Sequence, residues 1–350
     1  MCIPNYNYAH YIGKTIESVL AQTYDNFEIV IADNASTDES LDVIRAFGSD
    51  KIRIYENKYN VGFAPNIDKA TAPARNDYVI VISSDDVMNP DALQTYARVI
   101  EGLGDQAERA VLTSAIDVID ADGAITDVMY RPPGDLFYQS IPVAQAEDLT
   151  WAGQPVDRHP GSEALQRTLR AKDSPAVFLA TCYSRKLYEQ VEGYNSGYRM
   201  WPDGHFLNKV LSLPDTELVY VPERLFQYRV HSRNQLAGEA KQGALKYQVD
   251  AYLHTVEFPD DVLDRIGMRR GELVDVFIEK AVMERGLQAM AASNAERALK
   301  CLAFGFATYP RQAAFQPKTY ALAGLIAMGP VGTKVAAGLY RWHRRRRDAS

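Results

Sequence analysis

Two adjacent carboxylates follow an apolar, strand-like segment and could serve a bound cation. Asp85 and Asp86 come after the run 78–82 and two serines. When strands and helices alternate, the strands form an open parallel sheet whose ligands lie outside the carboxyl ends of the strands. Because neighbouring carboxylates repel each other without a cation, the pair is placed to hold a metal-bound ligand. Capping of the next helix is the alternative, but Asn89 is the better N-cap and Pro90 fits the first helical position.

Polar side chains also follow the expected strand at 27–32. Asp33 and Asn34 lie at its carboxyl end, where short polar groups can contact a nucleotide base or a ribose hydroxyl. A turn-forming role for Asp33 is an equal alternative, since Asp and Asn favour turns for backbone reasons. Ser36 with Glu39 three residues later forms a capping box, which predicts the start of a helix.

The first strand leads into a similar segment. Tyr6 offers a flat apolar face on which a base could stack, and packing on the following helix is the alternative. Only three residues precede Pro4, whereas central strands usually have about five or six. We therefore expect a few further apolar residues upstream of Met1. An early Pro4 also argues against a signal peptide.

Hydrophobic periodicity predicts the elements that position these residues. We expect strands at 27–32, 52–55, 78–84 and 110–114, with helices at about 38–47, 65–72 and 90–103. Strands separated by helices imply parallel pairing with right-handed crossovers. Asp122-Gly123 then predicts a hairpin, and the proline-rich stretch 131–175 predicts a long excursion with little regular structure.

The second half of the chain changes character. Short strands at 218–222 and 226–230 are expected to complete the sheet. After about residue 235 the apolar residues recur at helical spacing, in one stripe over 274–282 and another over 295–306. These two stripes predict an antiparallel pair of helices.

Composition restricts the class of protein. The 350 residues are 47% apolar and 24% charged, as in a soluble globular enzyme. A net charge of −7 argues against a nucleic-acid-binding protein. Three isolated cysteines, Cys2, Cys182 and Cys301, exclude a disulfide framework and fit a reducing compartment.

The end of the chain combines apolar and basic residues. An apolar run at 320–328 is interrupted by Pro330, and Arg341 with Arg344 to Arg347 makes the last ten residues basic. A membrane-spanning helix needs about twenty uninterrupted apolar residues, so attachment at an anionic membrane surface is the better prediction. A core helix with a solvated basic end is the alternative.

Taken together, these segments resemble family 2 inverting glycosyltransferases of the GT-A fold. The matching segments are Pro4–Asn7, Ser18–Tyr24, Asp33–Asp38, Asn60–Phe63, Ser84–Asp86, Gly193–Asn195, Trp201–Asp203 and Tyr228–His231. The resemblance covers about residues 1–235. It implies a nucleotide-sugar donor, a divalent metal on the donor diphosphate and transfer with inversion at the anomeric carbon.

The resemblance also implies roles for individual positions. The donor-binding residues would be Pro4, Tyr6, Asp33, Asn34, Asn60, Gly62 and Asp85. Asp85, Asp86 and His231 would hold Mg²⁺ or Mn²⁺, hard cations that suit carboxylate ligands. Two departures from the family pattern weaken this assignment: many relatives carry Asp where this chain has Asn34, and Asp again where it has Ser83. A lone His231 also fits a structural role.

The acceptor hydroxyl needs a general base, and the resemblance assigns this role to Asp203. Apolar neighbours Trp201, Pro202 and Phe206 would raise the pKa of Asp203 toward a useful range. An exposed Asp in a Pro-Asp-Gly turn is the alternative.

The sequence therefore predicts an α/β protein with the GT-A nucleotide-sugar-binding fold and a helical extension. We expect the donor half at 1–120, the acceptor half at 121–235 and the extension at 236–350. The expected function is transfer of a sugar to a glycan or lipid-linked acceptor in surface polysaccharide biosynthesis, on the cytoplasmic face of the cell membrane. An inactive sugar-nucleotide-binding or scaffold protein is the alternative, since Ser83 and Asn34 depart from the family pattern.

Overall fold

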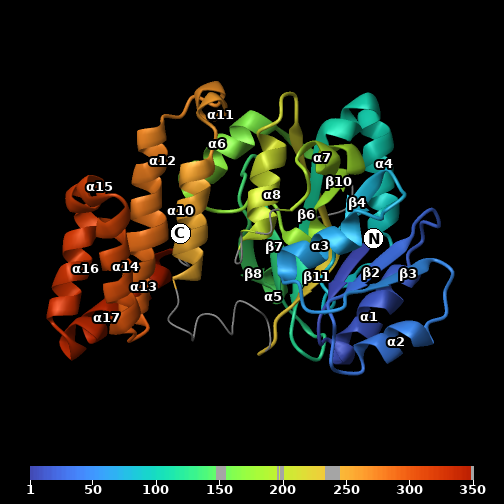
Figure 1. Ribbon diagram of the computed structural model, residues 1–350, viewed down its shortest axis with the longest axis horizontal. Helices are drawn as coiled ribbons and strands as arrows, with labels where there is room; N and C mark the ends of the chain where they lie inside the picture. Colours follow the sequence, from blue (N-terminus) through green and yellow to red (C-terminus); the bar gives the residue numbers. More distant parts are fainter. Residues whose placement is uncertain (147–154, 195–196, 198–200, 233–244, 348–350) are drawn as a thin grey trace. The chain divides into compact units, whose positions relative to one another are not determined.

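The computed structural model in Figure 1 describes residues 1–146, 155–194, 197, 201–232 and 245–347. These residues form two compact units. The first consists of Met1–Leu165 and Ser174–His231, and the second of Gln166–Asp173 and Ser232–Ser350. The expected domain boundary at residue 235 lies outside the described residues.

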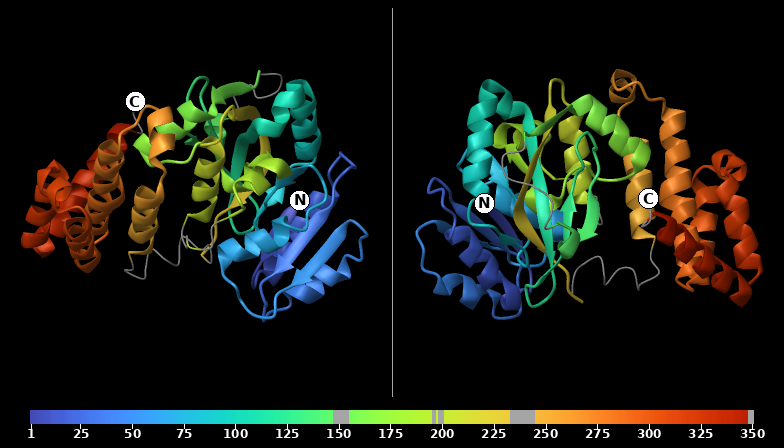
Figure 2. Two further views of the ribbon diagram at one scale, coloured as in Figure 1. Left: turned by 45° about the horizontal axis from the view of Figure 1, so that its top comes forward. Right: turned by 180° about the vertical axis from the view of Figure 1, so that it is seen from behind.

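The first unit begins with the predicted parallel strands. β1 (Cys2–Asn5), β2 (Ile29–Asp33) and β3 (Ile52–Glu56) pair in the order β1-β2-β3. On its other side β1 contacts the chain just after β4 (Tyr78–Ile80), through a parallel bridge between Cys2 and Val81. β4 is shorter than the predicted strand because the chain turns away after Ile82, before the two aspartates. Figure 2 shows these strands from two further sides.

Three helices connect and cover these strands. They are α1 (Ala9–Leu20), α2 (Ser40–Ala46) and α3 (Phe63–Thr71). Ile12 and Ile16 of α1 belong to the same core as Ile29 and Ile31 of β2. Strand side chains alternate between the two faces, so α1 packs on the face to which Ile29 and Ile31 point. In Figure 1, α1 and α2 lie side by side beneath these strands.

Polar residues of α1 hold the segment that follows the two aspartates. The Thr15 hydroxyl donates to the carbonyl oxygen of Asp86 at 2.8 Å. The Ser18 hydroxyl accepts from the Met88 amide at 3.1 Å. Gln22 donates to the Asn89 carbonyl at 2.8 Å and accepts from the amide of Leu93. Thr15 and Ser18 of α1 and Gln22 just after its end therefore fix this whole segment together.

The rest of the sheet is mixed rather than parallel throughout. β10 (Cys182–Ser184) lies between β4 and β6 (Ala110–Ile119) and is antiparallel to both. β11 (Glu217–Arg229) runs parallel to β6. The prediction of two short strands at 218–222 and 226–230 was wrong in detail, because β11 continues past Pro222 through register irregularities. The short strand β5 (Val87–Met88), which the sequence did not predict, pairs with β11.

The Asp122-Gly123 hairpin is confirmed. β6 and β7 (Ile125–Tyr130) are antiparallel. Asp120 accepts the amides of Asp122, Gly123 and Ala124, and Gly123 has a φ of 99°. The stretch 131–175 holds more regular structure than predicted, namely β8 (Gln139–Pro142), α5 (Val143–Ala146), β9 (Asp157–Pro160) and α6 (Gly161–Ala171).

Both predicted N-caps were wrong. α4 (Ala92–Leu103) begins after Asp91, and the Asn89 side chain bonds instead to the Arg224 carbonyl and to Gln227 of β11. α2 begins at Ser40, where Asp38 accepts the Ser40 amide at 3.1 Å. In both places a tertiary contact uses the polar side chain that local sequence reasoning assigned to a cap.

Further helices of the first unit follow these strands. They are α7 (Arg185–Gln190) and α8 (Pro202–Leu211), with short 3₁₀ turns at Gly104–Arg109 and Phe178–Ala180. α7 is capped by Ser184, whose hydroxyl accepts from the Leu187 amide. α8 carries Pro202 in its first turn, a position that proline favours.

The second unit is helical. Its elements are α10 (Lys246–Glu257), α11 (Asp260–Arg265), α12 (Arg270–Val276), a π-helical segment (Phe277–Glu284), α13 (Arg285–Ala291), α14 (Ala295–Thr308), α15 (Pro310–Phe315), α16 (Pro317–Ala327) and α17 (Pro330–Arg347). The apolar stripe expected at 274–282 lies on α12 and the π-helical segment, and this segment packs against α14, which carries the second stripe. Phe277, Ile278, Ala281 and Val282 are buried in their core. Within the described residues, no helix has the length and apolar character needed to cross a bilayer.

Candidate active site

The carboxyl ends of the first strands meet at one edge of the sheet. Asn5 and Asp33 are paired positions at the ends of β1 and β2. The Ile82 amide donates to the Cys2 carbonyl, so the chain leading to Asp85 runs beside β1 as far as this edge. The fold therefore brings Asn5, Asp33 and Asp85 to neighbouring strands. This is the edge at which the alternation of strands and helices predicted a ligand.

Asp33 is fully buried and organises the turn after β2. Its carboxylate accepts from Asn5 Nδ2 at 2.8 Å, from the Ser36 hydroxyl at 2.6 Å and from the Ser36 amide at 2.9 Å. The Ser36 hydroxyl in turn accepts from the Asn7 amide. Ser36 therefore links the turns after β1 and β2 and is no part of a capping box. Asp33 thus has the turn-forming contacts that sequence reasoning kept as an alternative to ligand binding.

Asn34 holds the loop that follows β3. Its side-chain oxygen accepts from the Val61 amide at 2.9 Å, and its Nδ2 donates to Asn60 Oδ1 at 3.0 Å and to the Gly62 carbonyl at 3.2 Å. Gly62 has a φ of 93°, which favours glycine, and it precedes α3. Asn34, Asn60 and Gly62 are therefore in direct contact. The side chain of Asn60 and the backbone of Gly62 remain exposed at this edge, as does the 42% exposed ring of Tyr6.

Asp85 and Asp86 lie against the end of β11. The Asp85 carboxylate and His231 Nε2 are 2.9 Å apart, and both side chains are buried. Asp86 Oδ1 accepts from the Arg229 amide at 2.9 Å. Burial raises the pKa of both carboxyls, and the charge of Asp85 adds to the upward shift at Asp86. The structure thus brings together three predicted residues that are separated by nearly 150 positions in the sequence.

Two tyrosines of the first turn and α1 complete the surroundings of His231. The ring centroids of Tyr11 and His231 are 4.7 Å apart, and those of Tyr8 and His231 are 5.9 Å apart. Burial and then the charges of Asp85 and Asp86 raise the pKa of the Tyr8 phenol. Tyr8 and Tyr11 therefore face the carboxylate pair, although sequence reasoning placed only Tyr6 at the site.

Arg229 is a further residue that sequence reasoning missed. Its side chain is buried, with the residue only 1% exposed. Its Nε donates to the Asp85 carbonyl at 2.8 Å, and its Nη1 donates to the carbonyls of Asp120 and Ala121 at 3.2 Å. The guanidinium also lies over the Tyr11 ring, 5.1 Å from its centroid. Arg229 lies in the Tyr228–His231 segment that matches the family pattern, and this position could have indicated a role at the site.

The carboxylate pair fits a particular kind of metal binding. Across the described part of the chain, no three or more His, Cys, Asp and Glu side chains are grouped to hold an ion. A cation there would have few protein ligands. Mg²⁺ is commonly bound in this way, by one or two carboxylates together with substrate phosphates and water. Asp85 and Asp86 therefore fit a metal whose other ligands come from a diphosphate.

Asp203 lies in the first turn of α8 and is half-buried. Burial raises the pKa of its carboxyl above the ordinary range. Gly204 leaves room for the indole of Trp201, since a Cβ at this position would lie 2.0 Å from a ring atom. The ring of Tyr194 stacks on that of Phe206 at a centroid distance of 4.3 Å. Asp203 therefore lies on a helix whose first turns also carry aromatic packing.

The half-buried carboxylate of Asp68 joins this region to α3. Asp68 of α3 accepts from the Tyr194 amide at 2.9 Å and from the Tyr188 hydroxyl at 2.8 Å. Lys209 of α8 donates to the carbonyl of Gly193 at 2.7 Å. Asp68 and Lys209 thus both hold the chain that follows α7. Neither residue was predicted, and the contacts of Asp68 join positions more than 100 residues apart.

Comparison with known proteins identifies the class. The solved structure of S. aureus TarS 1-349 in complex with UDP-GlcNAc has a TM-score of 0.60 at 15% identity, and the alignment covers 97% of this chain and 90% of that one. This likeness shows the GT-A fold, a mixed α/β domain followed by helices. The fold and the sequence matches together define a nucleotide-sugar-dependent glycosyltransferase.

Residues 1–191 match the family model described as Glycosyl transferase family 2. An uncharacterized glycosyltransferase of Nostoc sp. is 30% identical over 279 residues, which are 76% of this chain and 75% of that protein. The chain belongs to glycosyl transferase family 2.

One relative has a specific activity in its name. The Escherichia coli protein WfaP, a UDP-Glc:α-D-GlcNAc-diphosphoundecaprenol β-1,3-glucosyltransferase, is 31% identical over 131 residues. The match covers 37% of this chain and 50% of WfaP, so the chain spans about half the length of that relative.

The buried position of Arg229 leads to a stability prediction. Arg229→Met should lower the free energy of unfolding by about 3 kcal/mol, because three carbonyl oxygens and the carboxylate pair lose their buried cation. Urea unfolding followed by tryptophan fluorescence measures the effect. Arg45→Met, which removes an exposed ion pair with Glu56, should change stability by at most about 0.5 kcal/mol. Equal urea midpoints for Arg229→Met and the wild type would contradict the proposed role of the guanidinium.

Proposed function

We propose that this chain transfers a sugar, with inversion at the anomeric carbon, from a nucleotide diphosphate to a hydroxyl of a glycan or lipid-linked acceptor in surface polysaccharide biosynthesis. The observation that carries the proposal is the contact of Asp85 with His231 beside Asp86, at the ligand-binding edge of a family 2 fold. WfaP is named for a lipid diphosphate acceptor, and TarS was solved with a nucleotide sugar. These two proteins support the proposed classes of acceptor and donor.

The donor is proposed to lie along the carboxyl edge of β1, β2 and the chain after β4. The residues assigned to it are Pro4, Tyr6, Asp33, Asn34, Asn60, Gly62 and Asp85. The exposed face of Tyr6 supports stacking on the base. Asn60 and Gly62 are exposed at the same edge and are held there by Asn34. Asp33 and Asn34 are buried, so their proposed contribution is to shape this edge as well as to contact the donor.

Asp85, Asp86 and His231 are proposed to hold Mg²⁺ or Mn²⁺ on the donor diphosphate. The bound cation would neutralise the charge that accumulates on the leaving diphosphate, without proton transfer. Arg229 keeps the carboxylates in place through the Asp85 carbonyl and the Asp86 side chain. Its buried positive charge also lowers the cost of two adjacent carboxylates before the cation binds.

Asp203 is proposed to take the proton of the acceptor hydroxyl during attack on the anomeric carbon. The raised pKa of its carboxyl makes it a stronger base than an exposed aspartate. Trp201 and the stacked rings of Tyr194 and Phe206 border its helix. Tyr194 and Phe206 are buried and support the helix, whereas the partly exposed indole of Trp201 offers a planar apolar surface that suits the apolar face of a sugar acceptor.

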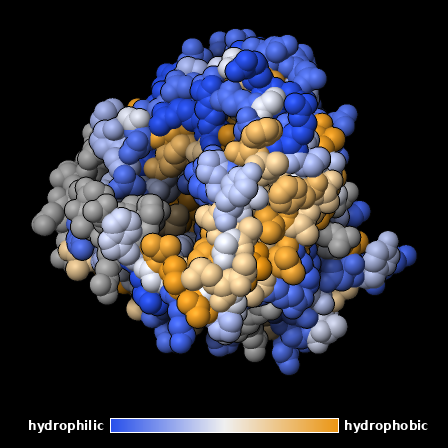
Figure 3. Space-filling model, turned by 90° about the vertical axis from the view of Figure 1, so that its left-hand side faces the viewer, coloured by the Kyte–Doolittle hydropathy of each residue, from blue (hydrophilic) through white to orange (hydrophobic). Residues whose placement is uncertain are grey.

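The last helix is proposed to lie on the anionic cytoplasmic face of the cell membrane. Exposed apolar side chains recur along one face of α17, at Val331, Val335, Leu339 and Trp342. Apolar residues gather on the side of the molecule that Figure 3 shows, which contains the last helices. The same helix carries exposed Lys334 and Arg341, and the sequence adds Arg344 to Arg347. An apolar face combined with basic residues is typical of helices that lie in the membrane interface.

The metal assignment predicts a loss of ligand-dependent stabilisation. Asp85→Ala and Asp86→Ala should each abolish metal-dependent transfer and keep the fold, because these carboxylates serve the cation. The measurement is a thermal-shift panel of nucleoside diphosphates and nucleotide sugars, with and without Mn²⁺. A ligand that binds together with Mn²⁺ should raise the melting temperature of the wild type but not of either variant.

Asp91→Ala is the matched control, since Asp91 is exposed in the following segment and caps nothing. Full activity in both Asp85→Ala and Asp86→Ala would overturn the metal site. If the wild type binds nucleotide sugar but releases no nucleoside diphosphate, the protein is the inactive sugar-nucleotide-binding or scaffold protein instead.

The base assignment predicts a separation of turnover from donor binding. Asp203→Asn should lower kcat by about two to four orders of magnitude and leave donor affinity nearly unchanged. In the wild type, kcat should fall as the pH drops through the raised pKa of Asp203, and this acid limb should be absent in the variant. Asp77→Asn, an exposed aspartate of the same unit, should behave as the wild type. Lost donor affinity with normal turnover would place Asp203 on the donor side.

The raised pKa of Asp203 also predicts a pH dependence of stability. The native carboxyl keeps its proton at pH values where the unfolded one has lost it, so the wild type loses stability as pH rises through this window. Asp203→Asn lacks this loss. The melting temperature of the variant should therefore exceed that of the wild type increasingly from about pH 4 upward.

The membrane assignment predicts a difference between two faces of α17. Leu339→Glu should abolish co-sedimentation with phosphatidylglycerol-containing vesicles, because it places a charge on the apolar face. Tyr340→Glu introduces the same charge at a neighbouring exposed position on the opposite face and should keep vesicle binding. Vesicles of phosphatidylcholine alone should bind both proteins weakly. Equal binding by the two variants would contradict insertion of this face.

A further inference from the structure

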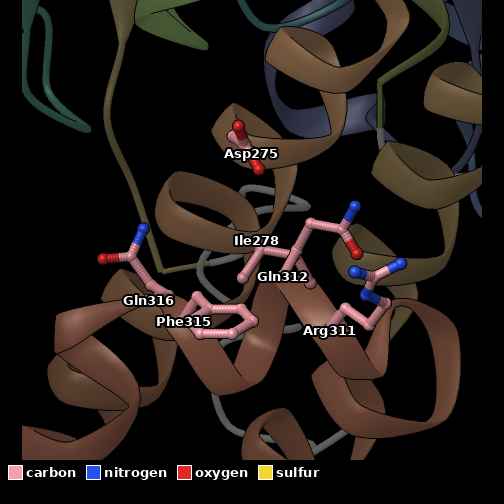
Figure 4. A pocket seen from close by; sticks show the side chains of 6 residues that line it. All are labelled: Asp275, Ile278, Arg311, Gln312, Phe315 and Gln316. Carbon is pink, nitrogen blue, oxygen red and sulfur yellow. The ribbon is translucent and has the colours of Figure 1, made fainter.

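The helical unit contains a cavity of about 470 Å³ that no part of the proposed mechanism uses. Figure 4 shows the six residues that line it, which are Asp275, Ile278, Arg311, Gln312, Phe315 and Gln316. They come from α12 and the π-helical segment on one side, and from α15 and the residue after it on the other. The volume lies within the range of cavities that hold small ligands.

The polar groups of this cavity have few partners within the protein. Among the described residues, no hydrogen bond or ion pair is recorded for the side chains of Asp275, Arg311 and Gln312. In Figure 4 the carboxylate of Asp275 lies above Ile278, the polar ends of Gln312 and Arg311 lie to the right of Phe315, and the amide of Gln316 lies to its left. The side chains of Asp275, Arg311 and Gln312 therefore line the cavity with hydrogen-bonding capacity that the described contacts do not use, whereas Oε1 of Gln316 accepts from the Lys318 amide at 3.4 Å.

Phe315 supplies an apolar surface beside these groups. Its ring is 83% exposed, although burying a phenylalanine typically stabilises a protein by about 1.5–3 kcal/mol. A single exposed aromatic residue is common and carries little weight alone. Here the exposed ring lines a cavity together with two amides, a carboxylate and a guanidinium, which is the combination that matters.

The walls of the cavity are held in place from several directions. Tyr309, which precedes α15, packs on Phe277 of the π-helical segment at a centroid distance of 5.8 Å. Lys318 of α16 forms ion pairs with Glu279 and Glu284 of the same segment. The Thr319 hydroxyl donates to the Ala313 carbonyl at 2.7 Å. The loop that carries Phe315 and Gln316 is thus fixed at both ends against the helix that carries Asp275 and Ile278.

The π-helical segment contributes to this arrangement. It begins at Phe277, between the two residues that its helix presents to the cavity. Insertion of a π turn changes which side chains face a given direction, and such insertions are frequent at functional sites.

We infer that this cavity binds a neutral oligosaccharide segment of the glycan acceptor. Asp275 and Arg311 carry opposite charges, so the lining has no net charge and favours neither an anion nor a cation. The amides of Gln312 and Gln316 provide donors and acceptors for neighbouring hydroxyl groups. The exposed ring of Phe315 offers a flat surface for the apolar face of a pyranose. The lining combines polar side chains with one flat aromatic ring. This combination suits a sugar ring better than a lipid or a phosphate.

This inference rests on the proposed function, because it assigns the bound sugar to the acceptor. A binding site on the same chain as the transferase unit raises the effective concentration of a tethered acceptor. The cavity should therefore favour long acceptors over short ones. Its loss should weaken the apparent affinity for long acceptors and leave the donor reaction unchanged.

Saturation-transfer-difference NMR on the full-length protein tests binding directly. The probes are neutral oligosaccharides of one to six glucose, galactose, rhamnose or N-acetylglucosamine units. Wild type should transfer saturation to at least one series, and Phe315→Ala should lower the affinity about tenfold. Phe306→Ala is the matched control, since Phe306 is an exposed phenylalanine of α14 outside the cavity. No transfer to any probe, or equal affinities for Phe315→Ala and wild type, would overturn the inference.

Charge substitution tests the class of ligand. Asp275→Asn leaves Arg311 unbalanced and should add affinity for oligosaccharides that contain a uronic acid. Inorganic phosphate should not displace the neutral probe from the wild type. If phosphate displaces the probe equally well from the wild type and from Phe315→Ala, the cavity is an anion site instead. Phe315→Ala should also bind vesicles as the wild type does. If the variant loses vesicle binding but binds sugar as the wild type does, the ring of Phe315 contacts the membrane instead.

Activity measurements separate this inference from the proposed function. Without an acceptor, Phe315→Ala should hydrolyse the donor and release nucleoside diphosphate at the wild-type rate. With acceptors, the variant should show a higher KM for long acceptors only. Absence of any release by the wild type would contradict the proposed function without affecting the binding result. An unchanged KM for long acceptors in an active Phe315→Ala variant would contradict the role of the cavity in acceptor binding.

Discussion

The contact between the end of β11 and the carboxylates after β4 is the constraint on which the site depends. Asp85 and Asp86 are buried, and adjacent buried carboxylates are costly unless charges and donors compensate them. Arg229 and His231 supply this compensation from one short segment. Because β11 is parallel to β6 and also pairs with β5, its register determines where that segment ends. The whole sheet therefore sets the geometry of the proposed metal site.

Polar residues of neighbouring elements hold the surrounding loops. These contacts do not involve the side chains of Asp85, Asp86 and His231, which are the proposed metal ligands. Thr15 of α1 and Gln22 just after it bind the main chain on either side of β5, and Asn34 binds the loop before α3. Each of these contacts joins a loop to a regular element that is fixed by the core. Rigid support of this kind positions a site more accurately than the loops could by themselves.

The acceptor side has a separate support. Asp68 accepts from the amide of Tyr194 and the hydroxyl of Tyr188, so α3 holds the chain that leads toward Asp203. α3 also follows Gly62 in the donor half. One helix therefore borders both the proposed donor edge and the segment before the proposed base.

The sequence alone determined the class of fold, the parallel strands of the donor half and the identity of most candidate site residues. These follow from hydrophobic periodicity and from local motifs, which reflect short-range geometry. Tertiary structure decided how the polar residues are used. Ser36 and Asn89 have the types of helix caps, yet each bonds to a distant segment. The roles of Arg229 and Asp68 also emerged only in three dimensions, because a buried charge is recognised by partners more than 100 residues away and no local pattern records them.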